Sequence, residues 1–305
     1  MRYLAKKIIE ALITIFIVTI IVFLAIHSSG DPINSLLPDS ATEAQRQELT
    51  EKLGLDRPLV EQYGRFVKDA LSGDLGTSYT SKRPVLEMIA EKLPYTFELA
   101  LVAIIIAFIV TIIFGSLAAI WKNTILDRII LAIAAFFKAS PIFFIAILAV
   151  QLLGVKLRVL PVAGAGTPLH LVMPAGLLGL AIASDMTTLL RSNMIAVLES
   201  DFIKFGRLRG LPEYKVILKH ALRNSFSSVL ALSSFIFASL ISGSIVVETI
   251  FAWPGVGILS YNSVISRDFP VVQGIVLILS ILTILLSFTM DALLAMLDPR
   301  IRKSV

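Results

Sequence analysis

Residues 199–225, ESDFIKFGRLRGLPEYKVILKHALRNS, form a polar, basic segment between two long apolar runs. The sequence Gly-Leu-Pro at 210–212 predicts a break between two short helices, because glycine permits a left-handed turn and proline fits the first position of a new helix. In the second helix Lys215, Lys219 and Arg223 are spaced four residues apart and share one face. Spacing alone leaves two alternatives open. One is an amphipathic hairpin that buries its apolar face in a partner protein, and the other is a cytoplasmic loop whose cations only fix the topology.

Composition places the chain in the membrane class. Of its 305 residues, 56% are hydrophobic and only 16% are charged, which is too apolar for a soluble domain. The chain has no cysteine, and this excludes a disulfide framework and a thiolate metal site. Its three histidines, His27, His170 and His220, are scattered without ligand spacing, so no metal site is expected.

Six segments are apolar over about 20 residues, the length that a hydrocarbon core of about 30 Å requires. They are residues 8–26, 99–121, 129–153, 169–190, 225–251 and 271–297. The first follows Arg2, Lys6 and Lys7 and is long for the apolar region of a secretory signal, so a retained signal anchor is favoured over a cleaved signal peptide. The sequence therefore predicts an all-α integral membrane protein with six transmembrane helices.

The distribution of Lys and Arg predicts the orientation of these helices. With the N-terminus in the cytoplasm, the short outside loops hold only Lys156, Arg158 and Arg267, whereas the inside segments hold the basic hairpin and both basic termini. Both termini and the hairpin are therefore expected in the cytoplasm. The predicted parts are residues 1–27 (tip and first transmembrane helix), residues 28–94 (an extracytoplasmic helical segment) and residues 95–305 (a five-helix transmembrane core with the hairpin at 199–225).

The extracytoplasmic segment is predicted to contain short helices. A polar helix is expected at 42–53 behind a threonine cap, and an amphipathic helix at 58–71. A turn cluster follows at 73–78, and a third helix, at 84–92, leads into the second span. The segment either caps the outer mouth of a pathway or docks an external protein, or else it is a small structural domain that covers the helix bundle.

Charged residues inside the predicted spans indicate functional positions. Lys138 lies near the middle of the third span, where a charge costs roughly 2.5–3.5 kcal/mol and should face protein or water. Pro141 is expected to loosen this helix one turn later. Asp185 and Asp291 are the obvious counter-charges, both expected nearer the cytoplasmic ends of their spans. Lys138 either lines a pathway or forms a buried salt bridge, and for Asp291 a structural or interfacial role is favoured. The candidate pathway residues are Lys138, Glu248 and Asp291.

The hairpin resembles the coupling loop of permease subunits from ATP-binding-cassette (ABC) importers. Lys204, Phe205 and Gly206 stand where that family has Glu-Ala-Ala, and Gly210 takes the place of its later glycine. The first three positions depart from the family pattern. The Gly-Leu-Pro turn and the sequence HALRN at 220–224 are similar to the branch that imports dipeptides, oligopeptides and nickel chelates.

Other motifs extend the resemblance over nearly the whole chain. They are GDLG at 73–76, VVETIFAWPGVG at 246–257, RDFPVVQ at 267–273 and LDPRIR at 297–302. The resemblance implies the type I ABC importer permease fold, with the coupling loop seated in a groove on the ATPase subunit. It assigns ATPase coupling to Lys204, Phe205, Gly206, Arg207, Arg209, Gly210, Leu211, Pro212, Lys215 and Lys219.

The resemblance also implies the partners. They are a similar second permease, two ABC ATPase subunits and an extracytoplasmic binding protein, assembled in the bacterial inner membrane without nucleic acid. The chain has no G-x-x-x-x-G-K-[ST] loop, so it is expected to be a translocation subunit without enzymatic activity or a cofactor of its own, with ATP and Mg bound by the partners. Short peptides and nickel chelates are both family cargo, and the Arg-Leu-Arg-Gly run at 207–210 looks slightly more like the nickel branch.

Two other functional classes compete with this interpretation. Titratable pairs deep in several spans would favour a self-contained secondary transporter or channel. A nucleophile and a base at helical spacing would favour an intramembrane enzyme. The basic cytoplasmic hairpin, in a chain without an ATP-binding loop, favours the importer subunit.

Overall fold

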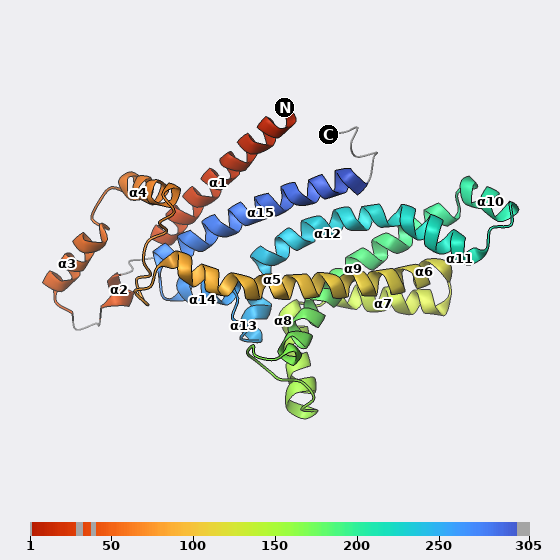
Figure 1. The fold of residues 1–305 in the computed structure, drawn as a ribbon. Coiled ribbons are helices and arrows are strands. Elements are labelled where there is room, and N and C mark those ends of the chain that lie inside the picture. Colours follow the sequence, from red (N-terminus) through yellow and green to blue (C-terminus); the bar gives the residue numbers. More distant parts are fainter. Residues whose placement is uncertain (1, 29–32, 38–40, 298–305) are drawn as a thin grey trace. The chain divides into compact units, whose positions relative to one another are not determined.

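The computed structural model describes residues 2–28, 33–37 and 41–297, which Figure 1 shows as a series of helices. Contacts divide the chain into two compact units. The first unit consists of Met1–Thr96 and Pro254–Leu285, and the second of Phe97–Trp253 and Leu286–Val305. The chain boundary expected after residue 94 falls inside the long helix α5, which passes through Pro94.

The first unit contains the short helices that precede the second span, together with part of the C-terminal region. Its elements are α1 (Arg2–Ser28), α2 (Ile33–Leu36), α3 (Glu43–Leu53), α4 (Leu59–Leu71), the first part of α5 (Val85–Val110), α14 (Val256–Ile265) and the first part of α15 (Phe269–Leu297). Thr42 begins α3 with a capping box, in which its hydroxyl accepts a hydrogen bond from the Gln45 N–H and the Gln45 side chain accepts one from the Thr42 N–H. The helices predicted at 42–53 and 58–71 are confirmed. The one predicted at 84–92 continues without interruption into the second span as α5.

The turn predicted at 73–78 is fastened by a buried carboxylate. Asp268 is 3% exposed and accepts hydrogen bonds from the Ser78 hydroxyl (2.6 Å), the Tyr79 N–H (2.9 Å) and the Thr80 N–H (3.2 Å). Burial, and secondarily the negative charge of Asp268, raises the pKa of Tyr79 to about 12. Beneath the turn lies an apolar core formed by Leu75, Val85, Ile89, Val256, Val271 and Ile275.

The second unit is arranged around α9. Its elements are the rest of α5, η1 (Thr111–Gly115), α6 (Ser116–Ile120), α7 (Ile125–Ala139), α8 (Ile142–Ala149), η2 (Val150–Lys156), α9 (Pro168–Leu198), α10 (Asp201–Leu208), α11 (Glu213–Lys215), η3 (Val216–Leu222), α12 (Arg223–Gly243), α13 (Ile245–Ile250) and the last part of α15. The helices α7, α8, α12 and α6 pack against α9, as does the π-helical turn η1. Gly179 permits the close approach of α9 and α5, because a Cβ there would lie 2.8 Å from the carbonyl oxygen of Ala103.

Helices occupy all six segments that were predicted to span the membrane. Among the described residues, three helices are long and apolar enough to cross a bilayer, and a bent pair makes up to four; these are Val85–Ile120, Pro168–Leu198, Phe269–Thr289 and the pair Ile125–Ala139 with Ile142–Lys156. Two predicted spans are interrupted. The third bends by 104° at Ser140 and Pro141 instead of merely loosening, and the fifth is broken at Ser244, between α12 and α13.

Candidate functional site

The hairpin contains the turn that the sequence predicted. Gly210 adopts φ of +79°, and the hydrogen bonds around it form a Schellman motif: the Gly210 N–H donates to the carbonyl of Arg207, and the Leu211 N–H donates to that of Gly206. Leu211 packs over Gly206, where a Cβ would lie 3.2 Å from its Cδ1. Pro212 stands one position earlier than predicted. It is the N-cap of α11, and its carbonyl accepts bonds from the Lys215 and Val216 N–H groups.

Two ion pairs brace the hairpin. The Arg207 guanidinium donates two hydrogen bonds across the turn to the Glu213 carboxylate, at 2.5 and 3.2 Å, and these bonds lower the pKa of Glu213 below its usual range. Within α10, Lys204 Nζ lies 2.9 Å from Asp201 Oδ1 and lowers the pKa of that carboxyl group in the same way. The backbone hydrogen bonds therefore fix the turn, and one exposed ion pair spans it.

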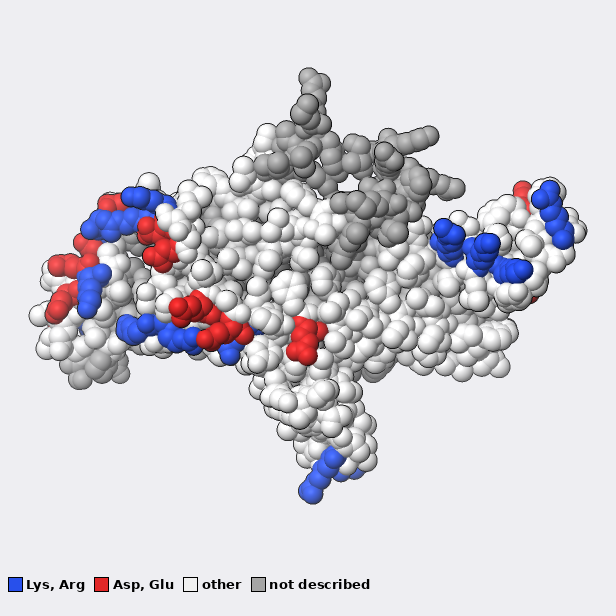
Figure 2. All heavy atoms as spheres, in the orientation of Figure 1, with Lys and Arg blue, Asp and Glu red and all other residues white. Residues whose placement is uncertain are grey.

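The outer surface of the hairpin is both apolar and basic. Ile203 and Val216 are buried and anchor it, whereas Phe205 is 66% exposed and Leu208 82% exposed. Figure 2 shows Lys and Arg side chains gathered over α10 and α11, the elements that form the hairpin in Figure 1. The exposed large side chains are Phe202, Phe205, Leu208, Leu211, Tyr214 and Leu218, and the exposed cations include Lys204, Arg207, Arg209, Lys215, Lys219 and Arg223.

Two ion pairs join α7 to α9. Asp127 accepts two hydrogen bonds from Arg191, at 2.6 and 2.7 Å, and both side chains are largely buried. Lys138 Nζ lies 2.5 Å from Asp185 Oδ1, and these side chains are 69% and 47% exposed in the chain. Asp185 was expected nearer the cytoplasmic end of its span; because α9 continues to Leu198, it lies close to the middle of the helix, 13 residues from that end.

The other two pathway candidates are not members of this pair. Glu248 is fully buried in α13 and accepts a hydrogen bond from the Ser244 hydroxyl at 2.6 Å. Asp291 belongs to α15, in the part whose side chains lie outside the described residues. A pathway role for either residue stays a prediction. Within the described part of the chain, no group of three or more His, Cys, Asp or Glu residues is arranged to hold a metal ion.

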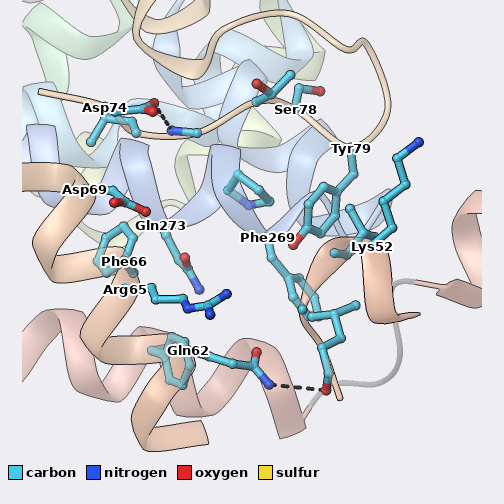
Figure 3. A pocket seen from close by; sticks show the side chains of 18 of the residues that line it. Lys52, Gln62, Arg65, Phe66, Asp69, Asp74, Ser78, Tyr79, Phe269 and Gln273 are labelled. Atoms are coloured by element: carbon cyan, nitrogen blue, oxygen red, sulfur yellow. Dashed lines mark hydrogen bonds between the residues drawn. The ribbon is translucent and has the colours of Figure 1, made fainter. Parts of the chain in front are cut away.

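A pocket in the first unit was missed by the sequence analysis. It encloses about 450 Å³, and Figure 3 shows Arg65, Phe66 and Asp69 of α4 on one side and Lys52 of α3 with Tyr79 on the other. The residues that line it come from several elements that are distant in sequence, so no local sequence motif could have predicted it. Side chains of both charges line it, and its charge therefore does not select one class of ligand.

The first comparison with known proteins is at the level of families. Residues 111–303 match the family described as "Binding-protein-dependent transport system inner membrane component", and residues 1–100 match its N-terminal companion, "Binding-prot-dependent transport system membrane comp, N-term". The chain belongs to this family. It is a permease subunit of an ABC importer, a multi-pass protein of the bacterial inner membrane.

Full-length relatives and solved structures agree with this assignment. The chain is 37% identical over 304 residues to the glutathione transport system permease protein GsiC of Escherichia coli O6:H1 and 38% identical over 303 residues to that of Pectobacterium atrosepticum, covering 99% of both chains in each case. An inward-facing structure of the MetNI methionine ABC transporter is similar at a TM-score of 0.59 and 16% identity, over 70% of this chain and 97% of that one. The fold is therefore that of a type I ABC importer permease.

Proposed function

We propose that this permease imports short peptides and that its hairpin couples their translocation to ATP hydrolysis by two partner ATPase subunits. The observation that carries the proposal is the exposed surface of the hairpin. Bulky apolar side chains such as Phe205 and Leu208 stand in water among cations, on a turn that is fixed by Gly210. An apolar patch on a rigid, charged element is typical of a protein interface.

The turn gives the hairpin the properties of a lever. Its Schellman motif and the Arg207–Glu213 bridge hold the two arms together. The second arm, α11, continues through η3 into α12 without a break in the helical backbone. A force applied to the hairpin is therefore transmitted along a helix into the membrane. The proposed assembly also contains a second, similar permease and an extracytoplasmic binding protein.

The relatives support a peptide as cargo. Glutathione, which the name of each GsiC relative states, is itself a short peptide, and those relatives match this chain from end to end. A nickel chelate is the alternative cargo. It rests only on the Arg-Leu-Arg-Gly run in the hairpin, which under this proposal contacts the ATPase and not the substrate. Uptake of labelled glutathione, dipeptide and nickel in cells with and without this chain tests the choice.

Replacement of Gly210 tests the coupling turn. Valine at φ of +79° is strained by about 1–3 kcal/mol, which corresponds to about a 5–150-fold change in an equilibrium. We expect Gly210→Val to retain assembly with the ATPases and to lose most substrate-stimulated transport. The matched control is Gly210→Asn, because asparagine tolerates positive φ. Normal transport by Gly210→Val would remove the basis for assigning coupling to this turn.

Sidedness is tested by reporter fusions. The distribution of Lys and Arg predicts that a reporter near Ser72 is outside the cytoplasm and one near Glu213 is inside. A hairpin outside the cytoplasm cannot bind an ATPase. If the two reporters fall on the same side, or on the opposite sides from those predicted, the six-span topology is wrong. Uptake that persists without the partner ATPases would indicate a self-contained secondary transporter instead.

A further inference from the structure

The Lys138–Asp185 pair lies far from the cytoplasmic ends of the two helices that it joins. The two ion pairs between α7 and α9 show that these helices run antiparallel, since residues 127 and 138 pair with residues 191 and 185. Lys138 is about 20 Å along α7 from Ile125, and Asp185 is about 20 Å along α9 from Leu198, at about 1.5 Å per residue. Both charges are therefore about 20 Å from the cytoplasmic ends of their helices, too far for either side chain to reach the water at that surface.

The helix break beside Lys138 also indicates that this residue faces protein or water and not lipid. Lys138 is in the last turn of α7, and the chain bends by 104° at Ser140 and Pro141 before α8 begins. The bend leaves carbonyl groups at the end of α7 without intrahelical partners. Irregular backbone at membrane depth is tolerated where it is buried in protein or lines a water-filled cavity. A broken span with a charge at the break is also the kind of site at which transporters bind their substrates.

The C-terminal half of α9 exposes a row of polar and small side chains that begins at Asp185. From Asp185 toward the end of α9, the exposed positions are Asp185, Thr188, Ser192 and Ala196, which follow one another at helical spacing. The opposite face carries Met186, Leu190 and Met194, all fully buried in the core of the second unit. The Thr188 and Ser192 hydroxyls donate to carbonyls of their own helix, so Asp185 is the member of this row that argues for protein or water, and not lipid, on this face.

We propose that Lys138 and Asp185 contact the substrate during translocation and that they select a zwitterion, a molecule with both a carboxylate and an ammonium group. This inference rests on the proposed function and names the part of the pathway that reads the substrate. The pair is held by one short contact between two half-exposed side chains, so it can open. Lys138 then binds the carboxylate of the peptide and Asp185 binds its ammonium group, and the pair closes again when the peptide leaves.

Each alternative position of the pair makes a different prediction. If it faced lipid, the charges would have no partner but each other. If it were sealed in the interface with the second permease, no water would reach the face of α9 that contains Thr188. If it lines the pathway, water reaches that face, and both charges are needed in their native positions for uptake.

The first test is thiol accessibility in the assembled complex. The chain contains no cysteine, so an introduced thiol is unique in it. Maleimides react with the thiolate, which forms only where water reaches the sulfur. We expect a charged maleimide to label Thr188→Cys but not Met186→Cys, the matched control on the buried face two residues away. An unlabelled Thr188→Cys would overturn the proposal, whichever substrate the complex transports.

The second test separates substrate selection from a structural role. Labelled glutathione is the probe, and uptake by the parent complex is measured first, because its absence would contradict the proposed cargo and not the position of the pair. We expect Lys138→Met and Asp185→Asn to assemble, to retain ATP hydrolysis and to lower uptake by about tenfold or more. The double variant Lys138→Asp/Asp185→Lys restores an ion pair with its charges exchanged. It stays defective if the pair reads the substrate, whereas restored uptake, unchanged uptake in the single variants, or their failure to assemble would overturn the proposal.

Discussion

The two ion pairs between α7 and α9 lie about three turns apart on α7 and fewer than two turns apart on α9, yet their surroundings differ. Asp127 and Arg191 are 3% and 18% exposed and share two parallel hydrogen bonds. Lys138 and Asp185 are 69% and 47% exposed and share one contact. The Asp127–Arg191 pair is expected to stay closed, because breaking it would leave a charge buried without a partner. The second pair can exchange its partners.

The difference assigns the two ends of this helix pair to different tasks. At the Asp127 end, the carboxylate also accepts a hydrogen bond from the Asn123 N–H, and Thr124 caps α7, so the turn before α7 is tied to α9. This end lies next to the start of the hairpin, because α10 begins three residues after α9 ends. We infer that the buried pair keeps α7 and α9 moving together, and that the exposed pair is free to act on what passes it.

The largest effect is expected from Arg191→Met, which leaves the Asp127 carboxylate buried without its cation. The expected loss is about 3–5 kcal/mol, measured as the midpoint of thermal unfolding of the purified complex and as its yield. The double variant Asp127→Asn/Arg191→Met removes both charges and keeps an acceptor for the Asn123 N–H, so it should recover much of the loss. If Arg191→Met alone is as stable as the parent, the contrast between the two pairs disappears.

A surface pair near the same turn provides the matched control. Lys122 Nζ lies 2.6 Å from Glu199 Oε1, and both side chains are well exposed. Lys122→Met should change stability by less than about 1 kcal/mol, as exposed ion pairs generally do. A loss equal to that of Arg191→Met would show that proximity to the hairpin, and not burial, determines the effect.

An intermediate loss of stability is expected from replacing Asp268, a buried carboxylate whose partners among the described residues are hydrogen-bond donors and not a cation. It is held by one hydroxyl and two backbone N–H groups. Asp268→Ala leaves these donors without their acceptor, at about 1–3 kcal/mol. Faster hydrogen exchange at the amides of Tyr79 and Thr80 is the expected signature. The control is Asp74→Ala, which removes only a local bond to the Gly76 N–H in the exposed part of the same turn and should leave those amides unchanged.

Local chemistry explains what the sequence predicted well. The turn at Gly210 and the capped start of α3 at Thr42 are encoded by residues within a few positions of one another, and both are present. The apolar runs located helices at all six predicted spans. Each of these features depends on neighbouring residues alone. An apolar run long enough to span a bilayer and a local capping hydrogen bond both form whatever the tertiary structure is.

Pairings over long separations could not be predicted in this way. Asp127 and Arg191 are 64 residues apart, and neither has a neighbour that signals the other. The apolar run of the fourth span stops at residue 190, but α9 continues to Leu198, and the Arg191 in this extension pairs with Asp127 of α7. Pro141 indicated a weak point in the third span, but the size of the bend depends on how α7 and α8 pack against α9.

The smallest effect is expected at the Arg207–Glu213 bridge, which is as short as the Lys138 contact but belongs to the exposed hairpin. Its side chains are 44% and 55% exposed, so the pair should contribute only about 0.2–1 kcal/mol. The pKa of Glu213 is lowered by its hydrogen bonds to Arg207. The contribution is therefore fully present above the ordinary glutamate pKa of about 4.3 and is lost as the pH falls through the lowered pKa.

Hydrogen exchange in α10 and α11, corrected for intrinsic rates, should show the hairpin loosening over that range in the parent and not in Arg207→Gln. Arg209→Gln, which removes a neighbouring charge but no ion pair found among the described residues, should behave like the parent. If the loss of stability in Arg207→Gln equalled that in Arg191→Met, the exposure of an ion pair would not determine how much it stabilises the protein.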